Sequence, residues 1–102
     1  MEWELDAWEQ VYKLVEECWT PEHCAAVNLM GTMVPVGLEF ATHYNLLGAI
    51  CKVLVRDDGL VPVDKFCVMA DFDWIEWSTH VDRSEVLKSI RRRMASVNYQ
   101  LN

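Results

Sequence analysis

The alternation of hydrophobic and polar positions predicts an amphipathic helix at the start of the chain. Between Leu5 and Trp19, large apolar side chains recur every three or four residues, which places them on one face of a helix. We predict a helix from about Trp3 to Cys18 whose acidic side chains lie mostly off that face. The apolar stripe is interpreted as core, as is usual for amphipathic helices; it comprises Leu5, Trp8, Tyr12, Val15 and Trp19.

The densest apolar segment runs from Thr42 to Val55, THYNLLGAICKVLV. Gly48 and Ala49 at its centre have little side-chain bulk, so another element can approach the backbone closely. We predict that this segment is a central buried helix on which an N-terminal and a C-terminal helix pack. The acidic pair and glycine that follow, Asp57 to Gly59, predict the turn that ends it.

A third helical pattern occupies the C-terminal part of the chain. Asp82-Arg83-Ser84-Glu85 resembles a capping box with Asp in the place of Ser or Thr, and Ser84 is a rival cap. Apolar residues then keep helical spacing, and the helix is predicted to run to about Tyr99; they are Val86, Leu87, Ile90, Met94, Val97 and Leu101.

The connecting segments have weaker signals. Thr20-Pro21-Glu22 is either a turn or a new helix start. Gly31 lies between two short apolar runs and Pro35 disfavours a helix, so a short β-hairpin or an extended excursion is predicted around Gly31. Leu60 to Ala70 fits a short helix or a buried strand, and the helix is preferred. Asp71 to Trp77 alternates acidic with apolar residues and is predicted to be a tight connection anchored by aromatic side chains.

These patterns define the predicted fold class. A chain of 102 residues supports one core, so residues 1–102 are expected to form a single compact domain. The class is mainly α with a minor β element: three principal helices around a central buried helix, with a short β-hairpin or extended excursion. The longest uncharged run, Phe40 to Cys51, is too short to span a bilayer. The acidic start of the chain lacks the features of a secretory signal, so a cytoplasmic location is predicted.

The charge distribution changes the expected class of partner. The formal net charge is −7, with acidic residues concentrated in residues 1–22 and 71–82, whereas the segment from Arg83 onward is basic. Phosphate groups would be repelled by the acidic bulk, so no direct nucleic-acid binding is expected. A basic protein surface is the more natural partner, and no membrane partner is expected.

The cysteine pattern favours free thiols packed in the core over a catalytic or metal-binding role. No two of them form a C-x-x-C pair, and in a reducing compartment free, mostly buried thiols are the default; they are Cys18, Cys24, Cys51 and Cys67. A cysteine nucleophile assisted by His43 or His80 is one alternative. A zinc site that includes Cys18, His23 and Cys24 is another, although the cysteines are spaced more widely than usual for zinc. We therefore predict no cofactor, no metal and no catalytic residue.

Neither the arginine cluster nor the paired carboxylates predict a binding site. Arg91, Arg92 and Arg93 on one helix would point about 100° apart, so they would not form one phosphate-binding patch. They are interpreted as a solvated face. The acidic pairs, Asp57-Asp58 and Asp71-x-Asp73, lack the regular ligand spacing of a divalent-cation loop.

The best functional candidate is the acidic, Trp-rich segment from Asp71 to Asp82. Acidic groups beside exposed aromatic rings suit docking onto a basic surface. The alternative is that Trp74 and Trp77 anchor the core while the acids are merely solvated. The predicted partner-binding residues are Asp71, Asp73, Trp74, Glu76, Trp77 and Asp82, together with Glu2, Glu9 and Glu16 of the first helix.

Several pieces in order along the chain carry a family resemblance: Cys18-Trp19-Thr20, Gly31 to Val36, Leu47-Gly48-Ala49, Trp77, and Arg83-Ser84 leading into Glu85-Val86-Leu87. They resemble an uncharacterised family of small bacterial and phage proteins, the domain of unknown function numbered 6197. Two positions depart from its pattern, because Cys18 replaces a Gly, and Ser78-Thr79 replace an Asn-Asp after the late Trp. The family has no established activity, so the resemblance implies architecture alone.

Three functional hypotheses follow. The first is a small acidic non-enzymatic binding protein, such as a phage-encoded inhibitor of anti-defence or anti-CRISPR type, that docks its acidic face on a basic nucleic-acid-binding partner. The second is a small-ligand-binding domain with a pocket between the hairpin and the central helix near Gly48, and with Arg83 or His43 as polar anchors. The third is a Cys/His-dependent enzyme or metal site. A homodimer is compatible with the first two.

Overall fold

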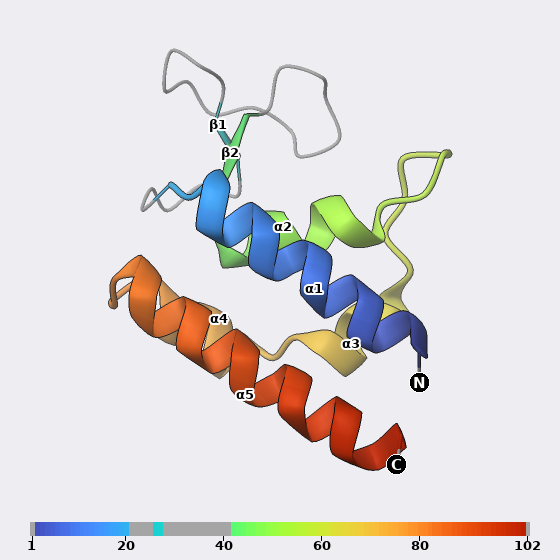
Figure 1. Ribbon diagram of the computed structural model, residues 1–102. Helices are drawn as coiled ribbons and strands as arrows, with labels where there is room; N and C mark the ends of the chain where they lie inside the picture. Colours follow the sequence, from blue (N-terminus) through green and yellow to red (C-terminus); the bar gives the residue numbers. More distant parts are fainter. Residues whose placement is uncertain (1, 21–25, 28–41, 102) are drawn as a thin grey trace.

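Five helices and one pair of very short strands make up the described part of the chain (Figure 1). The computed structural model describes residues 2–20, 26–27 and 42–101. In chain order the elements are α1 (Glu2–Glu17), β1 (Ala26–Val27), β2 (His43–Tyr44), α2 (Leu46–Leu54), α3 (Val63–Met69), α4 (Phe72–Ser78) and α5 (Arg83–Leu101). The mainly α class with a minor β element is confirmed. The turn or helix start at Pro21 and Glu22 and the excursion around Gly31 and Pro35 lie outside the described residues.

Helix α1 contacts both of the other principal helices. Of its predicted apolar stripe, Trp8 and Val15 are buried and Leu5 and Tyr12 are half-buried, while Val11, which the prediction left out, is fully buried. Helix α1 packs extensively against α5 on one side and α2 on the other. We had expected the N-terminal and C-terminal helices to pack on α2, but α5 packs mainly on α1. Helix α1 has 16 residues and presents apolar side chains to both α2 and α5, whereas the nine-residue α2 is covered by α1, α3 and α4.

Helix α2 is buried as predicted but begins later than the apolar pattern suggested. It starts at Leu46, not at Thr42, because the Asn45 side chain accepts a hydrogen bond from the Gly48 backbone N–H at 2.8 Å. A side-chain acceptor at this position satisfies a helix N–H that has no partner within the helix, so Asn45 defines the first turn. Leu46, Ala49 and Ile50 are fully buried against the core.

Strand β2, which lies just before α2, makes backbone hydrogen bonds on both of its sides. Tyr44 pairs with Ala26 and His43 with Val27 in the antiparallel β1–β2 ladder. On its other side, the Tyr44 backbone N–H donates to the Cys18 carbonyl at 2.7 Å, and the Tyr44 carbonyl accepts from the Thr20 N–H at 3.0 Å. The start of α2 is therefore fixed to the end of α1 through backbone hydrogen bonds.

The segments after α2 include two confirmed predictions and one error. The turn at Asp57 to Gly59 is present, with Gly59 at a φ of +83°, a conformation that glycine adopts without strain. The short helix preferred for Leu60 to Ala70 is present as α3. The tight connection predicted for Asp71 to Trp77 is wrong, because this segment forms α4. The Asp71 side chain accepts from the Trp74 N–H at 2.7 Å and thereby caps that helix.

The final helix begins where the capping signal placed it. The Asp82 carboxylate accepts hydrogen bonds from the Glu85 backbone N–H at 3.0 Å and from the Ser84 hydroxyl at 2.9 Å. Asp82 is therefore the cap, and Ser84 supports it. No helix in the described ranges combines the length and the apolar character needed to cross a membrane.

Candidate functional site

Helix α4 has one inward and one outward face. At about 100° per residue, Trp74, Ile75 and Ser78 fall on one side of the helix. Trp74 and Ser78 are buried, and Ile75 is half-buried. The opposite side, which we call the α4 outer face, spans an arc of about 140° and is exposed; it consists of Phe72, Asp73, Glu76 and Trp77.

Trp74 belongs to the core and not to a partner-binding surface. Its side chain is 8% exposed, packs edge-on with Trp8 at a centroid distance of 5.5 Å, and donates its indole N–H to the Ser89 hydroxyl at 2.7 Å. The Arg93 guanidinium lies over the same ring, 3.6 Å from its centroid. Burial corrects the prediction that Trp74 contacts a partner and supports the core-anchor alternative for this residue.

The outer face places two aromatic rings beside two carboxylates. Phe72 is 91% exposed and Trp77 is 37% exposed, and both Asp73 and Glu76 are exposed. Positions four apart on a helix are neighbours, so Phe72 lies beside Glu76 and Asp73 beside Trp77. Each pair combines an aromatic group with an acid, which suits a surface of mixed apolar and basic character.

The acids at the two ends of the Asp71 to Asp82 segment are helix caps. Asp71 caps α4, and its second carboxylate oxygen is 3.4 Å from the Arg93 guanidinium. Asp82 caps α5, and the hydrogen bonds from the Glu85 N–H and the Ser84 hydroxyl, aided by Lys88, hold the pKa of this carboxyl below its usual value. Both side chains remain exposed, so each still contributes negative charge to the surface.

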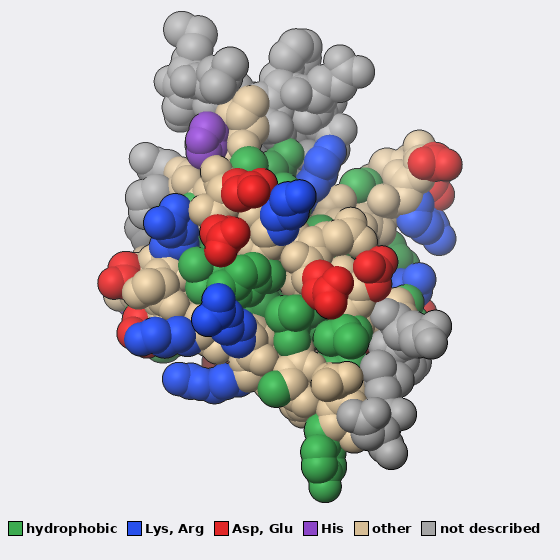
Figure 2. All heavy atoms as spheres, viewed as in Figure 1, with side chains coloured by type: hydrophobic (Ala, Val, Ile, Leu, Met, Phe, Trp, Pro, Cys, Tyr) green, Lys and Arg blue, Asp and Glu red, His purple; other side chains and the backbone are tan. Residues whose placement is uncertain are grey.

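The acids predicted on the first helix lie on a separate element. Glu9 and Glu16 are exposed and are two turns apart on α1, while Glu2 belongs to the first turn of the same helix. Figure 2 shows acidic side chains spaced along α1, basic side chains over the first half of α5, and a strip of hydrophobic side chains between the two helices. On this face the α1 acids have basic neighbours, so it is less uniformly acidic than the sequence suggested.

The three successive arginines of α5 diverge as expected. Arg91 lies 5.1 Å from the centroid of the Tyr12 ring on α1, whereas Arg93 covers Trp74 of α4. Arg92 is exposed. Two of the three guanidinium groups therefore pack on aromatic rings of different helices. The interpretation of all three as a solvated face holds fully for Arg92 alone.

The described cysteines of the alternative hypotheses differ in burial and lie in or next to different elements. Cys18 and Cys51 are half-buried, Cys67 is exposed, and burial raises the pKa of the Cys51 thiol. No group of three or more His, Cys, Asp or Glu side chains in the described residues could hold a metal ion. His23 and Cys24 lie outside those residues.

The anchors proposed for a pocket near Gly48 have other contacts. Gly48 is buried in α2, and the His43 ring is 2.9 Å from the Thr42 hydroxyl. The Arg83 guanidinium donates to the Glu16 carbonyl at 3.0 Å, at the C-terminal end of α1. Arg83 therefore connects α5 to α1, and the predicted hairpin wall of that pocket lies outside the described residues.

Phe72 is the candidate residue that the sequence reading missed. It stands between Asp71 and Asp73, and in a tight connection it would count as one more anchoring aromatic group. The signal was the capping pattern itself, because an Asp three residues before Trp74 starts a helix. Helical spacing from that start turns Phe72 away from Trp74 and toward Glu76.

No protein-family model, no curated protein and no solved structure matches the chain. The resemblance to the uncharacterised family stays a prediction.

Proposed function

We propose that this protein is a non-enzymatic binding protein that docks the α4 outer face onto a basic protein surface. The observation that carries the proposal is the 91% exposure of Phe72 beside Asp73, Glu76 and the partly exposed Trp77. When a partner covers a large apolar side chain that is so fully exposed, the free energy of the complex is lowered. Aromatic residues are also the side chains that most often dominate binding energy at interfaces.

Charge complementarity selects the class of partner. The chain carries a net charge of −7. Asp73 and Glu76 of the outer face are exposed, and neither takes part in a salt bridge with another described residue. Such a surface attracts a basic partner over a distance of roughly 10 Å at 0.1 M salt. Exposed charge pairs add little affinity individually, but several acids together attract a basic partner, so Phe72 and Trp77 provide the apolar contact and the acids the salt-dependent part of the binding.

The test is a pull-down from host lysate at low and high salt, followed by affinity measurement with the retained protein. We expect Phe72→Ser to weaken that affinity at least about tenfold, as loss of an interface anchor does. The matched control is Tyr99→Ser, because Tyr99 is 84% exposed on α5 and away from α4. Both variants should keep the melting temperature of the parent protein, since neither ring is buried.

Two outcomes would contradict the proposal. One is equal binding by the Phe72 and Tyr99 variants. The other is strong binding that is insensitive to salt, since an electrostatic interface weakens when it is screened. A Glu9→Gln/Glu16→Gln variant compared with Asp73→Asn/Glu76→Gln, which removes the same charge, decides between the α1 acids and the α4 acids.

A narrower form of the proposal is inhibition of a nucleic-acid-binding protein, such as an anti-defence role in a phage. Its support is the acidic surface alone, since carboxylates can occupy sites that otherwise bind phosphate. Competition would test it: a short DNA or RNA duplex should displace the protein from its partner, and binding of both at once would exclude this role while leaving the docking face intact.

A further inference from the structure

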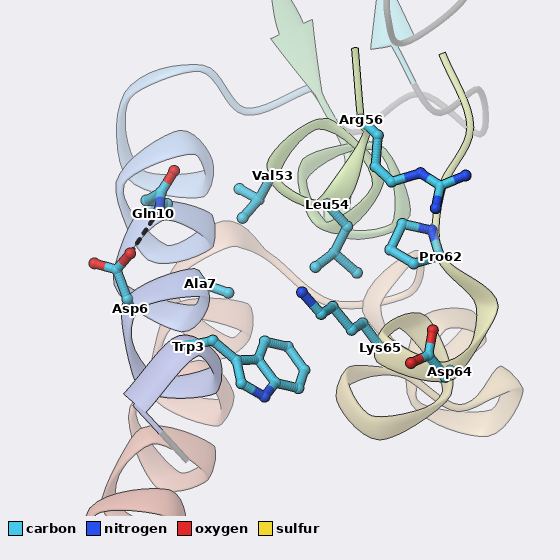
Figure 3. Close-up of a pocket in the computed structure, with 10 residues that line it drawn as sticks. All are labelled: Trp3, Asp6, Ala7, Gln10, Val53, Leu54, Arg56, Pro62, Asp64 and Lys65. Carbon is cyan, nitrogen blue, oxygen red and sulfur yellow. Dashed lines mark hydrogen bonds between the residues drawn. The ribbon is translucent and has the colours of Figure 1, made fainter. Parts of the chain in front are cut away.

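A cleft of about 420 Å³ lies on a different part of the molecule, between the first half of α1, the end of α2 and the start of α3 (Figure 3). Its volume falls within the range of about 300–1,000 Å³ that small-molecule sites occupy. None of the α4 outer-face residues lines it. An inference about this cleft therefore stands apart from the proposed docking function.

The floor of the cleft is apolar. Ala7 and Leu54 are buried core residues that reach its surface, and Val53 and Pro62 are half-buried beside them. The indole of Trp3 forms one wall (Figure 3). Such a floor favours the apolar part of a ligand, because covering it removes apolar surface from water.

Lys65 supplies a positive charge directly above this floor. Figure 3 shows its side chain reaching from α3 into the cleft toward Trp3 and Leu54, and its ammonium is 5.1 Å from the centroid of the Trp3 ring. Lys65 makes no salt bridge within the ranges that the structure describes. An ammonium held over an aromatic ring without a carboxylate partner is available for an anionic group.

The remaining charged groups limit how much negative charge the cleft accepts. Asp6, which accepts from Gln10 at 3.3 Å, and Asp64 lie on opposite sides of Lys65 in Figure 3. The Arg56 guanidinium is 3.0 Å from the Asp58 carboxylate and is largely neutralised by it. The two flanking carboxylates repel any anion in proportion to its charge, so a single negative charge placed directly against Lys65 is the most that the cleft accepts.

We propose that this cleft binds a small organic monoanion, that is, an apolar body that carries one carboxylate or sulfonate group. The acidic group pairs with Lys65, and the body covers Ala7 and Leu54 against the Trp3 wall. A neighbouring hollow of about 330 Å³ shares Gln10 and Val53 with the cleft and provides room for a longer body.

Anilinonaphthalene sulfonate is a suitable probe because it is an aromatic monoanion whose fluorescence rises in apolar sites. We expect Lys65→Gln to weaken its binding to the protein about tenfold, as the loss of one charge-assisted contact does. Arg92→Gln is the matched control, since it removes one exposed positive charge elsewhere and should leave the dissociation constant unchanged. Equal dissociation constants for the parent and Lys65→Gln would overturn the proposal.

Two further comparisons make the test specific. The neutral analogue phenylnaphthylamine should bind the parent protein more weakly than the sulfonate does and should not discriminate between parent and Lys65→Gln. Inorganic phosphate should not displace the probe. Loss of probe binding in Phe72→Ser, or displacement by phosphate, would place the probe outside the proposed arrangement and overturn it. Failure here would leave the docking proposal untouched, because that proposal is measured with a protein partner.

Discussion

At the scale of single residues, the contacts of Trp74 connect three helices. Its ring meets Trp8 of α1 edge-on, its N–H bonds to Ser89 of α5, and Arg93 of α5 covers its face. An edge-on aromatic pair and a cation above a ring each add to the stability gained from burial. Trp74 therefore holds α4 against the rest of the core, which leaves the opposite side of α4 turned to solvent.

The hydrogen bond between Trp74 and Ser89 gives a residue-scale prediction. We expect Trp74→Phe and Ser89→Ala each to lower the free energy of unfolding by roughly 1–2 kcal/mol, because each removes one partner of a partly buried bond. The double variant should cost less than the sum of the two, since the bond is lost only once. Urea denaturation of the four proteins measures the cycle. Additive costs would show that the bond contributes nothing.

At the scale of elements, the long helices were predicted from the sequence, whereas α4 was missed despite the capping signal at Asp71. The apolar patterns of α1 and α5 each extend over several turns, so helical spacing is unambiguous there. Helix α4 has only seven residues, and its first part alternates acidic with apolar residues as a strand or loop would. The Asp71 cap is the local signal for a helix there, and the Trp74 contacts with α1 and α5, which no local pattern displays, add to it.

The candidate site, too, could be predicted only in part from the sequence. The acids and Trp77 were identified from composition, and they are exposed. Which of Trp74, Phe72 and Trp77 faces outward depends on their angular positions around α4. These positions could not be assigned while the segment was predicted to be a connection and not a helix. The cleft around Lys65 could not be predicted from the sequence, because its walls come from three separate elements of the chain.

The cap of α4 gives a prediction for this element. Asp71→Ala should lower the free energy of unfolding by about 1 kcal/mol, the usual cost of losing a side-chain cap. Asp71→Ser keeps an acceptor for the Trp74 N–H and should recover most of that loss, while it removes the contact with Arg93. Chemical denaturation of both variants provides the measurement. If Asp71→Ser were as destabilised as Asp71→Ala, the contact with Arg93 would matter and the cap would not.

At the scale of the whole molecule, net charge opposes folding. The chain carries a charge of −7, and the salt bridges in the described residues are all at exposed or partly exposed side chains. Such pairs contribute little, whereas repulsion among like charges acts over the whole surface. Screening by salt should therefore remove more repulsion than attraction.

We expect the melting temperature to rise by several degrees when sodium chloride is increased from about 0.01 M to about 0.5 M, because the Debye length falls from about 30 Å to a few Å. Differential scanning calorimetry at matched pH measures the change. Partner binding should respond in the opposite direction, so loss of a partner at high salt cannot be attributed to unfolding. A melting temperature that falls with salt would show that the ion pairs outweigh the repulsion.

The packing of α1 on α5 has a consequence for how the chain folds while it is being made. The buried side of α1, with Trp8, Val11 and Val15, leaves the ribosome well before α5, which covers it. At about 5–20 residues per second this side stays uncovered for several seconds. During that time α1 is a natural binding site for a chaperone, and the nascent chain cannot complete its core until α5 has been released from the exit tunnel.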